Sequence, residues 1–170
     1  MYHLFLKENS SSFLPKTLLE KIVVRSNISN IESFPVTALA FSAVTGQFPK
    51  TNYAKRPLAG FKIRKDQPLG LQVTLRSDNM LSFLKNLIFI VLPKFVDFDG
   101  VQEKKIDSRG DLHFGLTQFF FWPQCEAFYE TFRKPTGFHI SLVSKGSSKR
   151  KRMVYSYLGL PITDKEVNSF

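Results

Sequence analysis

Positively charged side chains gather in one segment of the sequence, residues 50–76, and the chemistry that they suit is phosphate binding. A lysine ammonium meets a phosphate oxygen as a point charge, whereas an arginine guanidinium binds two oxygens as a planar fork. Tyr53 and Phe61 offer rings on which an unpaired base can stack. Beside one acid, Asp66, the segment holds seven basic residues: Lys50, Lys55, Arg56, Lys62, Arg64, Lys65 and Arg76. The alternative is a solvated loop whose lysines extend into water.

A second basic run stands where the sequence predicts that the last helix begins. It consists of Lys149, Arg150, Lys151 and Arg152. Four cations at a helix N-terminus oppose the helix dipole, at a cost of about 0.3–1 kcal/mol each. Phosphates would neutralise this repulsion, so the run suits RNA, but a frayed and exposed first turn is an equally good reading.

Other chemistries find little support in the sequence. No spacing of histidine and cysteine suggests a metal site, and the stretch VDFDG, 96–100, lacks the remaining ligands of a calcium loop. The single cysteine, Cys125, excludes an intrachain disulfide and is typical of a small buried side chain. The histidines are scattered along the chain: His3, His113 and His139. We therefore predict no enzyme, no metal and no cofactor; an enzyme acting on RNA would need an acid–base pair beside the basic segment.

Composition narrows the class of protein and of partner. The 170 residues carry a formal net charge of +10, an excess that favours an acidic partner, most often nucleic acid. Hydrophobic residues make up 43%, enough for the core of one domain. The apolar run at 77–93 is too short to span a membrane and Lys85 interrupts it, so no membrane insertion is predicted. A membrane-surface protein would carry its basic residues on an amphipathic helix, whereas here they stand on loops.

Hydrophobic periodicity predicts the elements that must position these residues. Residues 15–25 are expected to form a helical turn that runs into a strand at KIVV, and further strands are expected at 69–76, 111–122 and 138–144. Helices are expected at 33–45, 77–93 and 147–160, with an irregular basic loop at 47–68 and a polar loop at 94–110.

Local signals define the two central helices. Around the first, Ser33 can cap the N-terminus, Pro35 suits the first turn, and Gly46 fits a left-handed stop. Its expected apolar positions are Ala38, Leu39, Phe41 and Val44. The second has Ser77 or Asp78 as a cap and Pro93 as a stop. Its apolar positions are Met80, Leu84, Leu87 and Val91.

The predicted strand 69–76 indicates how the sheet is covered. Leu71, Val73 and Leu75 alternate with Gln72, Thr74 and Arg76, so one face of the strand is apolar and the other polar. Because strands and helices do not alternate regularly, we predict an α+β fold: a two-layer sandwich of a mostly antiparallel sheet with helices on one face and a long basic loop. An uncovered polar face is a common platform for RNA.

Several segments, taken in order, resemble one known family. TGQFPKTNYAKRPLAGFKIRKDQPLGLQVTLRSDNMLSFLKNLI is similar to the central region of the universal large-subunit ribosomal protein five family, with its GQ turn, its A-GFK-I-R loop and its VTLR strand. Downstream, LPKFVDFDG, DSRGDLHFGL, FWPQ, GFHISLVSKG and LGLPI resemble further motifs of the family. The resemblance covers roughly residues 45–161.

This resemblance implies a protein of the ribosome's central protuberance, next to other proteins of that region. Family members bind 5S rRNA and large-subunit rRNA, touch the small-subunit head, and extend a basic loop to the P-site tRNA. Carried over by position, Gln47 and Thr74 belong to the rRNA-contacting surface, and Arg109 lies toward a small-subunit head protein. The tRNA-facing loop is Ala59, Gly60, Phe61, Lys62, Ile63 and Arg64.

The chain departs from the family pattern where RNA contact is expected. Arg25 stands where the family has an asparagine that meets 5S rRNA, and 149–152 replaces an acidic helix start. We hypothesise that the rRNA partner is remodelled, with 5S rRNA divergent or absent. The expected RNA-binding set is therefore the seven basic residues of 50–76 and the basic run 149–152, with Arg25, Gln47 and Thr74.

Further expectations concern the domain boundaries, the cellular location and the alternative function. We expect an abbreviated N-terminal segment, 1–20, one domain, 21–161, and a tail, 162–170. The 18 phenylalanines suit an AT-rich organelle genome, and MYHLFLKENSSSFL reads as neither a secretory signal nor an import leader. A mitochondrial ribosome in the matrix is the favoured home, ahead of another organelle or the bacterial cytoplasm. The alternative function is an RNA-binding module outside the ribosome.

Overall fold

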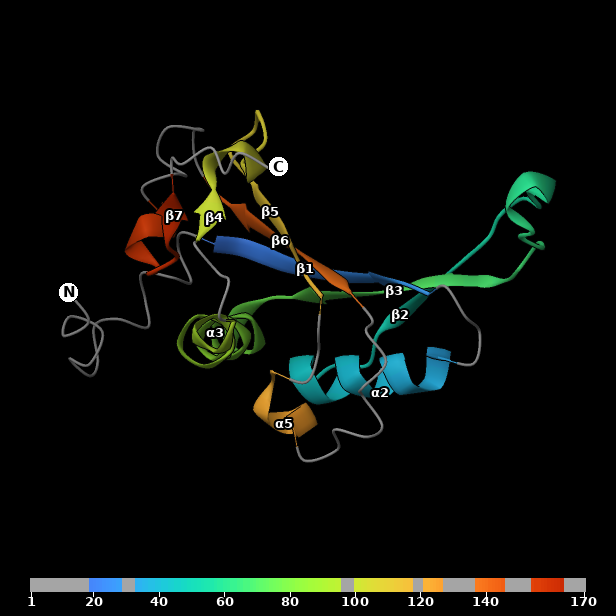
Figure 1. Cartoon of the computed structure of the whole chain (residues 1–170), viewed down its shortest axis with the longest axis horizontal. Coiled ribbons are helices and arrows are strands. Elements are labelled where there is room, and N and C mark those ends of the chain that lie inside the picture. The colour runs from blue at the N-terminus through green and yellow to red at the C-terminus, as the bar shows by residue number, and fades with distance from the viewer. Residues whose placement is uncertain are drawn as a thin grey trace.

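The fold is built on one five-stranded antiparallel sheet. The computed structural model describes residues 19–28, 33–95, 100–117, 121–126, 137–145 and 154–163. The strands follow the order β2-β3-β1-β6-β5, and every neighbouring pair is antiparallel (Figure 1). Their bounds are Leu19–Asn27 for β1, Lys50–Tyr53 for β2, Pro68–Leu75 for β3, Leu112–Leu116 for β5 and Phe138–Ser144 for β6.

Helices cover one face of this sheet and make the second layer. α2 (Phe34–Thr45), α3 (Ser77–Asn86) and α5 (Pro123–Glu126) lie below the sheet in Figure 1. Side chains on the covered face are buried along β1, β3, β5 and β6, and the alternate ones are mostly exposed or half-buried. Each fully buried Leu, Ile or Phe contributes about 1.5–3 kcal/mol, so this face holds the core. The predicted two-layer α+β sandwich with helices on one face is confirmed.

α2 begins and ends close to its predicted bounds. Pro35 lies in its first turn, and Gly46 ends it in the left-handed conformation, φ 66°. The Ser33 side chain does not cap the helix; instead the Thr37 hydroxyl donates to the Ser33 carbonyl at 2.8 Å. Phe41 is buried as expected, but Leu39 is 60% exposed. The two residues are two positions apart, which is about 200° around a helix, so one helix face cannot bury both.

The predicted helix 77–93 is present in three parts. α3 runs into a wider π-helical turn at Leu87–Val91, and α4 (Leu92–Lys94) closes the run one residue after Pro93. All four predicted apolar positions of this helix are buried. The N-cap is Arg76 and not Ser77 or Asp78 as predicted, because both of these residues already lie in α3. None of the helices in the described part of the chain has the length and apolar character to cross a membrane.

The loop 47–68 is less irregular than predicted. β2, Lys50–Tyr53, pairs with β3, and the pairing shifts between Asn52 and Tyr53. The sequence gives little sign of this edge strand because none of its four side chains is buried, so no apolar alternation marks it. The irregular segment is therefore the connection between two paired strands.

Two further predictions are corrected at the other end of the sheet. The strand expected at 111–122 ends at Leu116, and Trp122 is buried with its ring 4.9 Å from that of Phe83. The loop 94–110 contains β4 (Val101–Gln102), which pairs in parallel with β7 (Ile162–Thr163), and a 3-10 turn, Glu103–Lys105. Strand 138–144 is confirmed at its predicted bounds.

The last predicted helix is described only in part. Residues 154–157 are helical, and the start of the predicted helix, including the basic run 149–152, lies outside the described residues. β1 begins at Leu19 and β7 reaches Thr163. The division into 1–20, 21–161 and 162–170 stays a prediction.

A glycine on β3 allows the central strands to approach each other. A Cβ on Gly70 would lie 2.7 Å from the carbonyl oxygen of Ser26, which belongs to the backbone of β1. Real Cβ atoms essentially never come so close, and a backbone atom in a paired strand cannot move aside alone. Residue 70 must therefore be glycine for β1 and β3 to keep this register.

Replacing Gly70 by alanine tests this constraint. We expect Gly70→Ala to lower the free energy of unfolding by about 1–3 kcal/mol, because the strands must shift to admit the methyl group. Urea titration followed by circular dichroism measures the change. Gly60→Ala is the matched control, since a Cβ there meets nothing within 4 Å, and it should stay within about 0.5 kcal/mol of the parent. Equal stability of the two variants would contradict the constraint.

Candidate nucleic-acid interface

The sheet face opposite the helices, here called the open face, carries mostly polar side chains in register, with the buried Val23 and the glycine at 115 as exceptions. Directly paired residues share a face, so strand pairing alone sets the rows. One row runs Lys50, Gln72, Arg25, His139 and Gly115 from β2 to β5. A second row runs Thr74, Val23, Ser141 and His113. These nine residues define the open face.

Charge and hydrogen-bonding groups alternate along the first row. Lys50, Arg25 and His139 are exposed, and Gln72 is half-buried between the first two. Amide and hydroxyl groups of this kind reach 2′-hydroxyls and base edges, while the cations reach phosphates. The structure therefore brings together three residues of the predicted RNA-binding set, Arg25, Lys50 and Thr74.

Two predicted residues lie outside the paired rows of the open face. Gln47 is in the turn after α2, where its carbonyl accepts a hydrogen bond from the Thr45 hydroxyl at 3.1 Å. Arg76 follows β3, and its guanidinium lies 3.9 Å from the Glu20 carboxylate. Both side chains of that ion pair are exposed, so the pair contributes at most about 1 kcal/mol and leaves Arg76 accessible.

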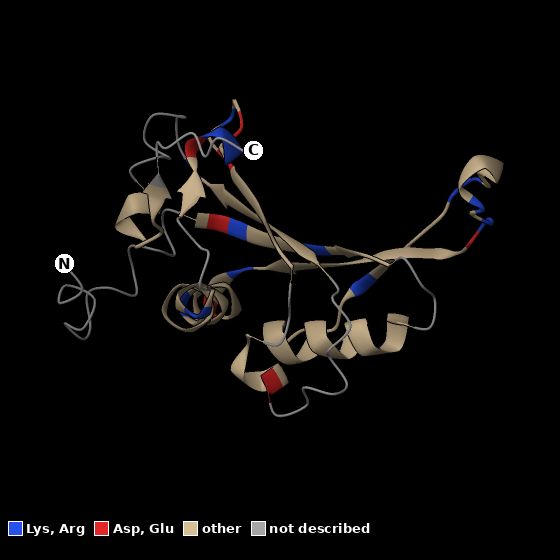
Figure 2. Cartoon of the chain, viewed as in Figure 1, with Lys and Arg blue, Asp and Glu red and all other residues tan. Residues whose placement is uncertain are grey.

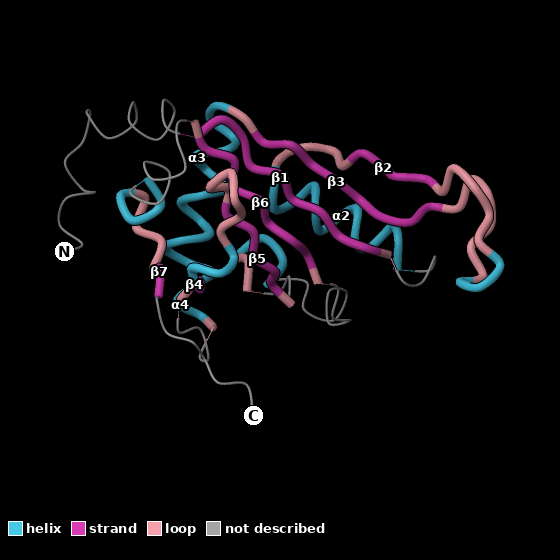
Figure 3. Tube along the Cα trace, turned by 90° about the horizontal axis from the view of Figure 1, so that it is seen from above, coloured by secondary structure: helices cyan, strands magenta, loops and turns pink. Residues whose placement is uncertain are grey.

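The other predicted cations that the structure describes stand on an arm, residues 54–67, that connects β2 and β3. Figures 1 and 3 show the arm projecting beyond the end of the sheet. Lysine and arginine gather along it in Figure 2. It carries Lys55, Arg56, Lys62, Arg64 and Lys65, all exposed, against the single acid Asp66. Within the described residues, no ion pair involves any of these five cations.

Backbone hydrogen bonds give the arm a defined shape. At its base, the Ala54 N–H donates to the Gln67 carbonyl and the Asp66 N–H to the Ala54 carbonyl, each at 2.9 Å. Nearer the tip, Leu58 and Ile63 exchange two hydrogen bonds, at 3.0 and 3.1 Å. Because the backbone is paired at both levels, the arm holds its cations in place with less ordering entropy left to lose on binding.

The tip of the arm combines apolar and basic side chains. A 3-10 turn, Ala59–Phe61, is followed by Lys62 in the left-handed conformation, φ 54°. The Phe61 ring is 79% exposed and Leu58 is 53% exposed. The side-chain carbonyl of Gln67 accepts the Arg64 N–H at 3.0 Å, which fixes the backbone beside the predicted tRNA-facing residues.

Arg109 lies on a tightly braced turn, residues 107–111, before β5. Asp107 and Asp111 join its ends: the Asp107 N–H donates to the Asp111 carbonyl at 2.9 Å, and the Asp111 N–H donates to the Asp107 carboxylate at 2.8 Å. Gly110 takes the left-handed conformation, φ 81°. The turn therefore exposes Arg109 on a fixed backbone.

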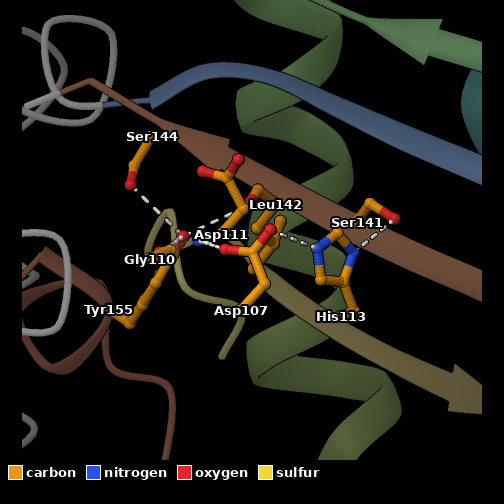
Figure 4. Close-up of polar contacts among 8 residues, drawn as sticks. All are labelled: Asp107, Gly110, Asp111, His113, Ser141, Leu142, Ser144 and Tyr155. Carbon is orange, nitrogen blue, oxygen red and sulfur yellow. Dashed lines mark hydrogen bonds and ion pairs between the residues drawn. The ribbon is translucent and has the colours of Figure 1, made fainter. Parts of the chain in front are cut away.

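A buried tyrosine, Tyr155, holds this turn through a hydrogen bond to the Gly110 carbonyl. Figure 4 shows Tyr155 reaching Gly110, Leu142 and Ser144. Its hydroxyl lies 2.9 and 3.0 Å from the carbonyl oxygens of Gly110 and Leu142, and 3.2 Å from the Ser144 hydroxyl. Burial raises the pKa of Tyr155 to about 12, so the phenol stays neutral and can donate.

Asp107 also orients a histidine of the open face. Its carboxylate lies 3.5 Å from His113 Nε2, and the Ser141 hydroxyl lies 3.0 Å from His113 Nδ1 (Figure 4). Burial acts to raise the pKa of Asp107, but the hydrogen bonds from Asp111, His113 and Arg109 outweigh it and hold the pKa below its ordinary value. His113 is therefore fixed by its neighbours at the β5 edge.

The arrangement offers binding groups rather than reacting ones. Cys125 is buried, and burial raises the pKa of its thiol to about 11, so it behaves as a small apolar side chain as predicted. In the part of the chain that the structure describes, no three His, Cys, Asp or Glu residues come close enough to hold a metal ion.

In the sequence alone, His113 and His139 are scattered histidines, and neither is among the candidate RNA-binding residues. Their alternation with buried neighbours, such as Phe114 and Ile140, was the signal that both belong to the same polar face as Thr74.

Comparisons with known proteins identify relatives of this chain. Residues 68–162 match the family model that describes the C-terminus of the ribosomal L5 family. A protein of Rippkaea orientalis named large ribosomal subunit protein uL5 is 37% identical over 121 residues, 71% of this chain and 66% of that protein. Proteins of the same name from a Synechococcus species and from Clostridium botulinum are each 35% identical over 148 residues, 84% of this chain and 81% of theirs.

Replacing Tyr155 tests the bracing of the 107–111 turn. We expect Tyr155→Phe to lower the free energy of unfolding by about 1–3 kcal/mol, because the buried Ser144 hydroxyl and the two carbonyls lose a partner. Since the folded pKa is raised from 10.0 to about 12, the tyrosine's contribution is complete below pH 10 and is lost as the pH rises toward 12.

Thermal unfolding at several pH values measures both effects. Tyr157→Phe is the matched control, because that side chain is 76% exposed, and it should change stability by less than about 0.5 kcal/mol. If Tyr155→Phe unfolds like the parent at neutral pH and shows the same alkaline loss, the bracing role is wrong.

Proposed function

Since this chain belongs to the ribosomal L5 family, the family of the large ribosomal subunit proteins uL5, we propose that its open face and its arm bind ribosomal RNA. It is a structural constituent of the large ribosomal subunit and not an enzyme. The observation that carries the RNA-binding proposal is the joining of a mostly polar sheet face, on which no described helix packs, to an arm whose five cations form no ion pair among the described residues.

Electrostatics assign different tasks to the two surfaces. The arm projects exposed cations on a hydrogen-bonded backbone, which suits insertion among phosphates of folded RNA. The open face adds hydroxyl, amide and imidazole groups in fixed register, which suits a closer reading of sugars and bases. The RNA-binding set proposed from the sequence therefore gains a structural rationale at Arg25, Lys50, Thr74 and along the arm.

The arm tip and the braced turn are proposed to meet separate partners. The tip, residues 59–64, is directed to the P-site tRNA in this proposal, supported by its exposed Phe61 ring beside Lys62 and Arg64. The turn that carries Arg109 is directed to a protein of the small-subunit head, supported by its exposure and by its rigid backbone. Neighbouring proteins of the central protuberance complete the proposed surroundings.

The identity of the rRNA partner is proposed from the departures in sequence. Arg25 stands at the centre of the open face, where it adds a charge that the family's asparagine lacks. This supports a remodelled contact, with 5S rRNA divergent or absent and large-subunit rRNA in its place. Gln47 and Arg76 stay in the proposed set, and so does the basic run 149–152, which lies outside the described residues.

The proposed home is a mitochondrial ribosome, supported by the phenylalanine content. Another organelle or a bacterial cytoplasm is the alternative, which the bacterial origin of the relatives above favours. The second candidate function is an RNA-binding module outside the ribosome, which the same charged arm would also serve.

Co-sedimentation with large subunits under a salt wash tests the proposed function. We expect the parent chain to stay with the large subunit, and the double variant Lys62→Gln and Arg64→Gln to be released at lower salt. Loss of two phosphate contacts should reduce the slope of log affinity against log salt by about 1.4–1.8, since each contact releases counterions.

A control on the helix layer makes the test specific to the arm. Lys85→Gln removes one exposed charge from α3, and its salt slope should equal that of the parent chain. Absence of the parent chain from washed large subunits would favour the RNA-binding module instead. An unchanged salt slope in the double variant would contradict the proposal that the arm binds RNA.

A further inference from the structure

The ring of His139 lies across the neighbouring strand, over Gly115. Its Nδ1 and Cε1 atoms are 3.4 and 3.5 Å from the place that a Cβ on residue 115 would occupy. His139 on β6 and Gly115 on β5 are direct partners in register, and both are exposed. The glycine leaves the strand backbone bare beneath the ring, so the imidazole rests on the sheet while part of it faces solvent.

The two histidines of the open face differ in how they are held. His113 has partners at both nitrogens, the Ser141 hydroxyl at 3.0 Å and the Asp107 carboxylate at 3.5 Å. Among the described residues, no hydrogen bond or ion pair engages the imidazole of His139. Within the described part of the chain, the imidazole of His139 is therefore available to a ligand, whereas that of His113 is occupied by the protein.

A cation stands directly beside this available ring. Arg25 on β1 pairs in register with His139, and both side chains are exposed on the open face. Cross-strand partners have Cβ atoms about 4.5–5.5 Å apart, so an arginine can reach a phosphate attached to a nucleoside whose base contacts the neighbouring ring. Gln72, the next residue in the row, adds an amide within the same strip.

We infer that His139 and Arg25 form a binding site for one unpaired nucleotide of RNA. The base stacks on the imidazole of His139, and the phosphate pairs with the guanidinium of Arg25. A base within a helix offers only its edges to a protein, so the site selects a nucleotide from a loop, a bulge or a strand end. This inference rests on the proposed function and adds a site for a single base to it.

Binding of two short single strands to the purified full chain separates stacking from charge. One probe is a fluorescent oligoriboadenylate, and the other is a strand of equal length made of abasic ribose phosphates. We expect the parent to bind the base-bearing strand more tightly. His139→Ala should weaken that binding by about fivefold or more and leave binding of the abasic strand unchanged, as for the loss of one stacked base.

Three further variants define the roles of the two residues. His139→Phe should keep the preference for bases, because the ring remains without its nitrogens. Arg25→Gln should weaken both strands and lower the salt slope by about 0.7, the value for one phosphate contact on a single strand. Tyr157→Ala is the control, because it removes an exposed ring that lies on neither the open face nor the arm, and it should change the preference by less than about twofold.

The outcomes separate this inference from the proposed function. If the parent binds both strands equally, or if His139→Ala keeps the preference for bases, the nucleotide site is wrong while RNA binding stands. If His139→Phe loses the preference for the base-bearing strand, the base does not stack on the ring, and a polar contact of the imidazole explains the preference instead. Binding of neither strand, together with absence from large subunits, would overturn the proposed function as well.

Discussion

One-sided burial of the five-stranded sheet is the constraint on which the rest of the structure depends. Apolar side chains such as Val24, Val73 and Ile140 meet on one face and are covered by α2 and α3. Their pairing in register forces the alternate residues onto the opposite face, where no helix of the described chain packs. A slip of one residue would exchange the two faces, so the apolar core and the polar interface are set by the same register.

The arm follows from the same pairing. β2 and β3 pair antiparallel, so the fourteen residues between them leave the sheet at its end and must return to it (Figure 3). Hydrogen bonds at the base and between Leu58 and Ile63 hold this segment in one shape. A dense set of cations would repel itself in isolation, and a neutralising polyanion stabilises such an arrangement. The fold thus places these charges on an arm that lies outside the hydrophobic core.

The sequence predicted the fold class, two helices and four strands because their apolar periodicity is strong, as at Leu71, Val73 and Leu75, although β5 ends earlier than expected. The prediction failed for elements that have no apolar periodicity. β2 has no buried side chain, and the pairing of β4 with β7 depends on residues about sixty positions apart in the chain. The cations of the candidate interface could be recognised from the sequence because basic residues are dense there. His139 could not, because its candidate role depends on its strand partners, Gly115 and Arg25, which are distant in sequence.

A cryo-EM map of the large subunit that contains this chain tests the central claim most directly. The account predicts that RNA covers the open face, with Arg25 and Thr74 within hydrogen-bonding distance of it, and that Arg64 lies among phosphates. An open face packed against protein or left in bulk solvent, with the arm far from any polynucleotide, would contradict the account.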